Sequence, residues 1–341
     1  MPVNQRHTRE RLYPSGEVLG PSSISKCSEE ALDLAKSNQW VISNIESDEV
    51  FSYSGNACRG GLGVSEDCLT LNVVRPSGFV PGNELPVVIW IYGGGLRAGG
   101  SSLASYNQSW IVHQSIRRKT PIIAVSINYS LAAFGWLWRK EMEATRASNL
   151  GLKDQRLAMK WVQENIAAFV GDPKKVTIQD ESAGAVRVGY HLFVYIGRDD
   201  GLFRGAIAES GTPASYKYCE DAAPWQPFFD NFTQATNCSS AASRLYCLKT
   251  IPVLTLSAGF IEYAPNENPY PPFIDGDMIT QSSTTSLKEE RPLKVPLICG
   301  TSFDEGTAFG ARNSAGMSSV QWPDYELDNP QNLVSRRMPL I

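Results

Sequence analysis

The sequence predicts an α/β fold, in which a mostly parallel sheet is flanked by helices. Short apolar runs recur along the chain, and near-continuous apolar runs are typical of strands that are covered on both faces. Segments with helical spacing lie between these runs, as in a sheet built from strand–helix–strand units. With 341 residues, 42% of them hydrophobic, the chain can bury a large core. The predicted strands are residues 69–74, 86–92, 121–128, 176–179, 205–210 and 295–300.

Two helices stand out between the predicted strands. The first is predicted over residues 154–169, where apolar residues recur near one face, and it stops before the sequence Gly-Asp-Pro at residues 171–173. The second follows the strand at 176–179 directly and is predicted over residues 182–195, with Gly197 as its end.

The domain organisation predicted from this pattern is a single core over residues 58–310. Residues 1–57 show no comparable order, and residues 311–341 have the composition of a loop. We therefore expect a poorly specified N-terminal segment, one α/β core and a loop-like tail.

Charge and hydropathy exclude several classes of partner. The net charge is −4, which argues against a nucleic-acid-binding protein, and the basic clusters at residues 117–119 and 336–337 are interpreted as solvated surface. No uninterrupted apolar run reaches the roughly 18 residues that a membrane span needs. The first sixteen residues are polar, so no secretory signal is predicted there.

The cysteines favour a secreted protein, whereas the N-terminus favours a cytoplasmic one. Of seven cysteines, Cys58 and Cys68 bracket a Gly-rich loop, and Cys238 and Cys247 bracket another short segment. Close pairs of this kind suit disulfides in a secreted protein. No pair has metal-type spacing, so neither a zinc site nor another cofactor is predicted. A cytoplasmic protein with free thiols remains the alternative. Four sequons for N-glycosylation begin at Asn107, Asn128, Asn231 and Asn237.

The strongest catalytic signal is Ser182, within the sequence Gln-Asp-Glu-Ser-Ala-Gly-Ala at residues 179–185. A short β-rich stretch precedes it and a helix is predicted to follow, which is the setting of a nucleophile elbow. Such a turn lifts the serine hydroxyl clear of the sheet and usually has the pattern G-x-S-x-G. Gly184 supplies the second glycine, whereas Asp180 stands in place of the first.

A glycine run supplies candidate donors for an oxyanion. Tyr92 and three glycines follow the predicted strand at 86–92, and a glycine run at the end of a strand can turn backbone N–H groups inward. The candidate donors are the N–H groups of Gly94, Gly95 and Ala183. Losing one such donor typically costs ~2.7–4 kcal/mol of transition-state stabilisation.

Several long motifs together carry a resemblance to a known family. They are SEDCLTLN from residue 65, IWIYGGGL, INYSLAAFGWL, the long run from ASNLGLKDQR to DESAGA, LFRGAIAESG, PPFIDGDMI and VPLICGTSFDEGTAF. Over residues 58–310 the chain resembles the type-B carboxylesterase and lipase family, the cholinesterase-like branch of the α/β-hydrolases, and its fungal lipase and esterase members in particular.

The resemblance implies a carboxylic-ester hydrolase that works through an acyl-enzyme on a small-molecule or lipid ester, without metal or cofactor. It places the nucleophile at Ser182 and the acid at Glu305, within Asp-Glu-Gly after the last predicted strand. Ser210 resembles a supporting position beside the catalytic residues. The family's loop disulfides resemble Cys58–Cys68 and Cys238–Cys247, and the family is secreted.

The chain departs from the family in ways that affect activity. The family's base is a histidine after the acid, but the three histidines are His7, His113 and His191, and none follows Glu305. His191 lies nine residues after Ser182 on one predicted helix, or ~13 Å along its axis, and is interpreted as structural. We therefore expect the literal chain to be inactive or a fragment; a non-catalytic binding protein of the cholinesterase-like type is the alternative.

Three further expectations follow from these departures. Asp180 adds bulk and negative charge at the contact of strand and helix. The family's domain extends further, so the predicted strand at 295–300 should form an uncovered sheet edge. The aromatic residues that could line an acyl or alcohol pocket, or instead fill the core as we expect, are Trp136, Trp138, Trp225 and Phe273.

Overall fold

The computed structural model describes a large part of the predicted core. The described residues are 59–60, 63–64, 68–96, 99–101, 103–139, 142, 148–212, 225–253, 255–256, 272–303 and 305. The predictions for residues 1–57 and 311–341 lie outside them. The chain divides into two compact units, Met1–Gly300 and Thr301–Ile341, which are described separately below.

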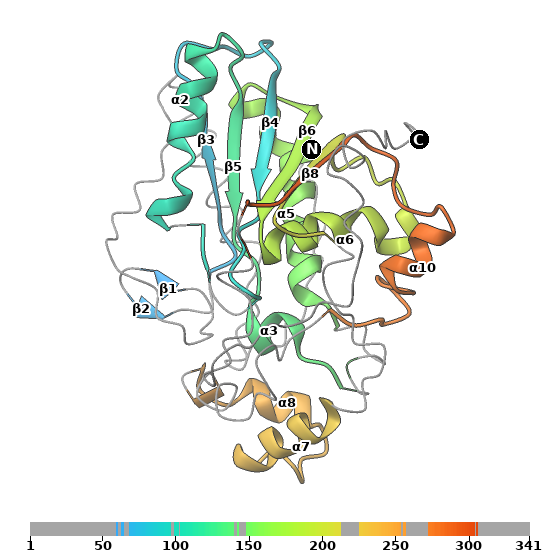
Figure 1. Ribbon diagram of the computed structural model, residues 1–341. Coiled ribbons are helices and arrows are strands. Elements are labelled where there is room, and N and C mark those ends of the chain that lie inside the picture. Colours follow the sequence, from blue (N-terminus) through green and yellow to red (C-terminus); the bar gives the residue numbers. More distant parts are fainter. Residues whose placement is uncertain are drawn as a thin grey trace, which may run out of the picture. The chain divides into compact units, whose positions relative to one another are not determined.

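A six-stranded sheet forms the centre of the first unit (Figure 1). Its order is β3-β5-β4-β6-β7-β8; β3 runs antiparallel to β5, and the other neighbours are parallel. This topology confirms the predicted α/β fold. Two strands of two residues each, β1 and β2, form a separate antiparallel hairpin. The strands are β1 Arg59–Gly60, β2 Gly63–Val64, β3 Leu71–Val74, β4 Leu85–Trp90, β5 Ile123–Ile127, β6 Gly171–Glu181, β7 Gly205–Glu209 and β8 Leu297–Gly300.

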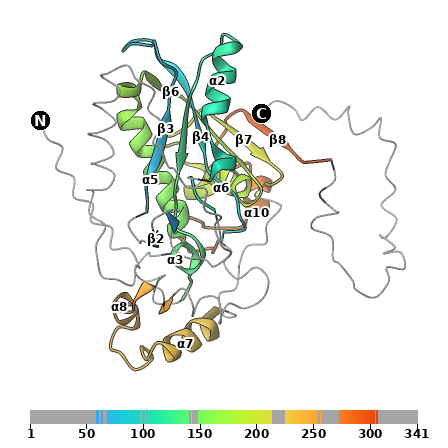
Figure 2. The same ribbon diagram turned by 90° about the vertical axis from the view of Figure 1, so that its left-hand side faces the viewer.

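Helices cover both faces of the sheet, and Figure 2 shows α2 and α5 on opposite sides of it. On one face, Val88 of β4 and Ala124 of β5 form a cluster with Val112 of α2. Their neighbours along the strands, Val87 and Val125, point to the other face and belong to the larger cluster with α5 and α6. The helices are η1 Ala104–Tyr106, α2 Ser109–Arg117, α3 Ala132–Trp136, α5 Leu150–Asn165, η2 Ile166–Phe169, α6 Ala183–Gly197, α7 Gln226–Ala235, α8 Arg244–Lys249 and α10 Ser283–Lys288. Of the helices in the described residues, none is both long and apolar enough to cross a membrane.

Two elements differ in extent from their prediction. The helix predicted over 154–169 begins four residues earlier, at Leu150 of α5, and its last turn is the 3-10 helix η2. The strand predicted over 176–179 extends over all of β6. In both cases the added residues include a buried polar side chain, Lys153 in α5 and Asp172 in β6.

The strand β8 forms an exposed edge of the sheet, as the sequence predicted. It is the last strand in the order, and all four of its residues are exposed, with Leu297 at 47% and Ile298 at 65%. Exposed, apolar edge strands are templates for pairing with another chain. We therefore expect the chain to self-associate through β8.

The variant Ile298→Lys tests this expectation, because a charged side chain on an edge strand opposes edge-to-edge pairing. Its apparent mass in light scattering at high protein concentration should fall toward that of the monomer, while the free energy of unfolding changes by less than about 0.5 kcal/mol at this exposed site. Tyr246→Lys, at a residue of α8 that is 70% exposed, is the matched control and should leave the association unchanged. Equal effects of the two variants would show that β8 is not the interface.

Candidate active site

Ser182 occupies a sharp turn between β6 and α6. Its backbone has φ 59° and ψ −130°, a combination that residues other than glycine rarely adopt and that costs energy. The surrounding backbone holds it there: the Ser182 N–H donates to the Glu209 carbonyl at 2.8 Å, and the Ser182 carbonyl accepts from Val186 at 3.2 Å. This is the geometry that the sequence Asp-Glu-Ser-Ala-Gly predicts for a nucleophile elbow, and residues 180–184 are called the elbow below.

The glycine loop after β4 lies directly against the elbow. A Cβ atom on Gly93 would stand 2.7 Å from the Glu181 carbonyl oxygen and 3.2 Å from the Ser182 Cβ, so only glycine allows this approach. Gly94 and Gly95 follow in an exposed turn, with φ 103° and 63°. The loop and Ser182 come from distant parts of the sequence, and they meet because the carboxyl ends of parallel β4 and β6 share one edge of the sheet.

Two buried tyrosines anchor the glycine loop. The Tyr129 hydroxyl donates to the Tyr92 carbonyl at 2.5 Å, the Tyr92 hydroxyl donates to the Tyr129 carbonyl at 3.4 Å, and the two rings stack at 4.6 Å. Both side chains are fully buried, and burial raises the pKa of both phenols, so they remain protonated donors. Gly93, which follows Tyr92 directly, is thereby fixed against the elbow.

Asp180 is fully buried within the elbow. Its Oδ1 accepts a hydrogen bond from the Glu181 N–H at 2.5 Å, and its Oδ2 has no partner among the described residues. Burial raises the pKa of Asp180 well above its ordinary value, although the Glu181 N–H and the Arg187 charge oppose that rise. The protonated form is therefore favoured, so the bulk expected from the sequence is present while the expected negative charge is suppressed.

Arg187 is a buried partner of the elbow that sequence reasoning missed. Its Nη1 donates to the carbonyl of Ala183, the first residue of α6, and its guanidinium lies 5.1 Å from the Trp136 ring centre. The side chain is fully buried, and its Nε and Nη2 have no hydrogen-bond partner in the described part of the chain. The sequence held one signal of this buried role, because Arg187 is a charged residue in an otherwise apolar helix that follows the serine.

Neither histidine in the described residues is available as a base for Ser182. His191 is 1% exposed, and its Nε2 shares a hydrogen bond with the Gln155 Oε1 at 2.8 Å. Burial lowers the pKa of His191 well below its ordinary value, so it is neutral and structural. His113 is exposed on α2, on the sheet face opposite α6. His7 lies outside the described residues.

The remaining candidate site residues follow β7 and β8 in the sequence. Ser210 follows β7 with φ 56°, and its N–H donates to the Gly300 carbonyl at 2.7 Å. Glu305 belongs to the second unit, where its Oε1 accepts from the Ser302 N–H at 2.8 Å in a tight turn. Within the described ranges, no three acidic, histidine or cysteine side chains gather to hold a metal ion.

The comparison with known families identifies the chain. The model of the carboxylesterase family matches residues 25–337. The chain belongs to the carboxylesterase family. It is 40% identical over 279 residues to a protein named Secreted lipase 1 of Botryotinia fuckeliana, covering 78% of this chain and 48% of that relative. Lipase 5 of Diutina rugosa is 40% identical over 258 residues, or 72% of this chain and 46% of the relative. The chain thus spans about half the length of these relatives.

Family membership agrees with the predicted resemblance and with the sheet described above. A third carboxylesterase relative, the secreted triacylglycerol lipase of Gibberella zeae, is 38% identical over 256 residues, 72% of this chain and 43% of the relative. Two of the three names include the word "secreted". The α/β-hydrolase prediction and the predicted membership of the carboxylesterase family are therefore confirmed.

One disulfide of this carboxylesterase-family chain joins the end of α7 to α8. It links Cys238 and Cys247, as the sequence predicted. Cys68 is also disulfide-bonded, with a partner outside the described residues, so its pairing with Cys58 stays a prediction. Cys299, on β8, is an exposed free thiol.

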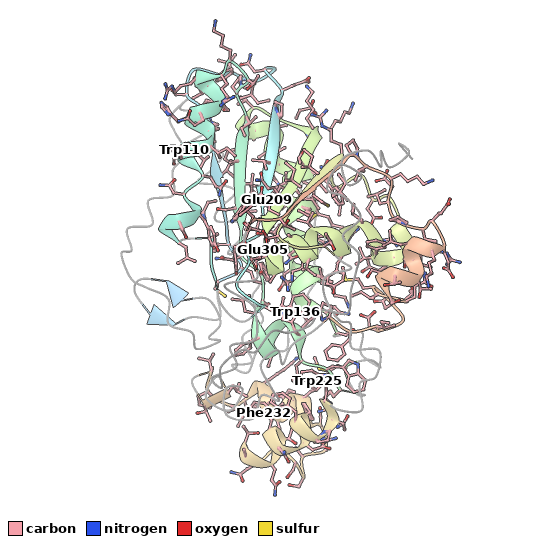
Figure 3. The ribbon with its side chains drawn as sticks, viewed as in Figure 1. Trp110, Trp136, Glu209, Trp225, Phe232 and Glu305 are labelled. Carbon is pink, nitrogen blue, oxygen red and sulfur yellow. A yellow bond between two sulfur atoms is a disulfide. The ribbon has the colours of Figure 1, made fainter. Side chains whose placement is uncertain are left out.

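The aromatic residues that could line a pocket mostly fill the core. Trp136 and Phe273 are each 1% exposed, and Trp138 stacks on Phe273 at 5.8 Å. Trp225 is partly buried and meets Phe273 edge-on, also at 5.8 Å. Figure 3 shows Trp225 near the helix α7 and Trp136 at α3. Because Trp138 and Trp225 both pack on Phe273, an ester pocket would have to be lined by other residues.

Proposed function

We propose that this chain carries the acylation centre of a carboxylic-ester hydrolase, with Ser182 as the nucleophile. The observation that supports this most directly is the strained Ser182 backbone, held against Gly93 and bonded to Glu209. Strain of this kind persists where the surrounding structure imposes it, and it concentrates at reactive sites. The substrate class is a small-molecule or lipid ester, which the lipase names of the relatives favour.

Each proposed residue has a role in acyl transfer. The Ser182 Oγ attacks the ester carbonyl, and the N–H groups of Gly94, Gly95 and Ala183 stabilise the negative charge on its oxygen. Ala183 is the first residue of α6, so its N–H also carries the positive end of the helix dipole. Glu305 is the proposed acid that orients the base, and Ser210 is proposed to support the site from the end of β7.

Ser182 attacks an ester efficiently only if a base accepts its proton, so the activity of the chain depends on such a base. The family's base is a histidine, whereas His191 is buried against Gln155 and His113 lies on the other sheet face. Without the base, the nucleophile and the oxyanion donors retain only the ~10³–10⁴-fold acceleration that remains when a triad member is lost. We therefore propose that the chain by itself is nearly inactive and that an added base restores turnover.

The alternative is a non-catalytic binding protein on the same scaffold. The engagement of His191 with Gln155 favours it, because a binding protein needs the fold and not the base. This alternative predicts cooperative thermal unfolding of the purified chain together with no reaction of Ser182 under any condition.

An imidazole-rescue experiment separates the two proposals. Hydrolysis of p-nitrophenyl butyrate by the chain alone should match a Ser182→Ala variant within about twofold, because no base activates the serine. Imidazole should then raise the rate of the wild-type chain above that of Ser182→Ala by about tenfold or more, since it can accept the serine proton. Acylated Ser182 should be detectable by mass spectrometry of the quenched reaction.

The control is Ser77→Ala, at an exposed serine far along the chain from the elbow, which should respond to imidazole as the wild type does. Robust Ser182-dependent hydrolysis without imidazole would contradict the missing base. If the wild-type chain is folded and imidazole raises its rate no further than that of Ser182→Ala, the proposed nucleophile is contradicted. The non-catalytic binding protein would then be the remaining proposal.

A further inference from the structure

The chain holds four N-glycosylation sequons, and the structure separates them by accessibility. The Cys238–Cys247 disulfide, and the second disulfide at Cys68, indicate an oxidising compartment, which is the compartment where N-glycans are attached. The relatives named as secreted proteins point the same way. The sequons begin at Asn107, Asn128, Asn231 and Asn237.

Asn128 cannot carry a sugar in the folded protein. Its Oδ1 accepts from the Ser101 N–H at 2.8 Å, and its Nδ2 donates to the Cys68 carbonyl at 3.1 Å and the Thr70 hydroxyl at 3.2 Å. These bonds tie the end of β5 to the segment before β3. A sugar on Nδ2 would replace one of its two hydrogens, so at least one of the two bonds that Nδ2 donates would be lost.

The two sequons of the α7 segment are compromised by their own neighbours. Asn231 is exposed on α7, but the Thr233 hydroxyl that completes its sequon is fully buried and donates to the Asp230 carbonyl at 2.9 Å. Asn237 is followed by Cys238, which is fully buried in the disulfide to Cys247. Helix formation and disulfide formation therefore compete with recognition of both sequons.

Asn107 is the least obstructed of the four, although Ser109 of its sequon is the first residue of α2. It is exposed in the short connection between η1 and α2. Its Oδ1 accepts from the Ser109 N–H at 2.9 Å, and within the described part of the chain its Nδ2 makes no hydrogen bond. The amide oxygen is thus fixed by the serine of the same sequon, while the nitrogen that would receive the sugar faces no competing partner.

Trp110 is the second observation at this place. It is 70% exposed at the beginning of α2, only three residues after Asn107, and its ring meets no other aromatic ring in the described ranges. A single exposed aromatic side chain needs no function to explain it, but its ring offers an apolar face that a sugar could cover. The apolar face of a sugar ring packs well on an indole ring.

We propose that Asn107 carries an N-linked glycan whose first sugar covers Trp110. In the transfer, the Asn107 Nδ2 forms a bond to the anomeric carbon of a lipid-pyrophosphate-linked oligosaccharide. The bond from that carbon to the pyrophosphate oxygen breaks, the lipid pyrophosphate leaves with the electron pair, and the amide nitrogen loses one proton. No oxidant or reductant is needed.

The test is secretion of the full chain, behind an appended leader, from a eukaryotic host. Peptide mass spectrometry after enzymatic deglycosylation in heavy-oxygen water should mark Asn107 as the most fully modified sequon and Asn128 as unmodified. The variants Ser109→Ala and Ser109→Thr form a matched pair, because both keep Asn107 and the Ser109 backbone; the first should abolish modification and the second should retain it.

The contact with Trp110 has its own readout. Hydroxyl-radical oxidation of the peptide that contains Trp110 should fall by about twofold or more when the glycan is present, because the sugar removes part of the ring from water. The Ser109→Ala protein supplies the unprotected reference. An unmodified Asn107 in the secreted chain would overturn the proposal, whether or not another sequon is used, and a modified Asn107 with unchanged Trp110 oxidation would overturn the contact.

Discussion

Gly184→Ala is expected to lower the free energy of unfolding by about 3 kcal/mol or more, at the upper end of the range for overpacked sites. A Cβ atom on Gly184 would stand 1.1 Å from the Asp180 Oδ2, 1.8 Å from its Cγ and 2.2 Å from the Ile91 carbonyl oxygen. The first two contacts involve a fully buried side chain, and the third involves backbone at the end of β4. Urea unfolding followed by circular dichroism measures the loss.

Removing the Asp180 side chain should recover part of that loss. In the double variant with Asp180→Gly, the clash with the carboxyl group disappears, whereas the clash with the Ile91 carbonyl remains. We therefore expect a coupling free energy of about 1–3 kcal/mol between the two sites, as for residues in direct contact. This coupling would show that Asp180 and Gly184 are one packing unit, in which the carboxyl group fills the space that the second glycine leaves open.

Gly205→Ala is the matched control, because Gly205 is also a buried glycine at the same sheet. A Cβ atom there would meet nothing closer than 3.6 Å, which is ordinary van der Waals contact. Its effect should stay below about 1 kcal/mol. If Gly184→Ala and Gly205→Ala were equally tolerated, or if Asp180→Gly left the cost of Gly184→Ala unchanged, the packing described for the elbow would be wrong.

The sequence was sufficient for the sheet and for the turn at Ser182, because both depend on local patterns. Apolar runs located all six strands of the sheet, and the small residues around Ser182 indicated a turn between strand and helix. The contact of Gly93 with Ser182 could be predicted as well, because parallel strands end at the same edge of a sheet.

Buried polar residues set the limit of that reasoning. Lys153 and Gln155 lie in the first turns of α5 and look like surface residues in the sequence, but both are buried; Gln155 lies against His191. Arg187 looks like a solvent-facing charge and lies beneath Trp136 and the first turn of α6. Such residues are specified by partners far away in sequence, which no local pattern records. Asp180 belongs to the same class: its residue type suggested a charge, whereas its burial raises its pKa and favours the protonated form.

Asp180 should make the stability of the chain fall as the pH rises above about 4, and Asp180→Asn should remove this loss. Below the ordinary pKa of an aspartate, about 3.9, the carboxyl is protonated in both the folded and the unfolded chain. Above it, the unfolded chain releases the proton while the folded chain keeps it, because burial raises the folded pKa. The unfolded state therefore gains about 1.4 kcal/mol per pH unit until the folded group ionises as well.

The measurement is the difference in unfolding free energy between Asp180→Asn and the wild type, taken at several pH values from 4 upward. The difference should grow in favour of Asp180→Asn, whose amide has the same shape and does not ionise. Asp172→Asn is the control, because a hydrogen bond from Lys175 lowers the pKa of Asp172, so its contribution to stability is complete above the ordinary pKa of about 3.9 and the difference from the wild type should stay constant over this pH range.

The charged groups that face Asp180 make the sign of this prediction a test of the elbow itself. Arg187 of α6 favours the ionised form, and Glu181 of β6 and Glu209 of β7 oppose it. If Arg187 outweighed burial, the folded carboxyl would be charged, the pH dependence would reverse, and a negative charge would lie beneath Ser182 where an ester oxyanion must form. A growing advantage of Asp180→Asn with pH would instead mean that the elbow presents a neutral acid to the nucleophile, which leaves the oxyanion donors unopposed.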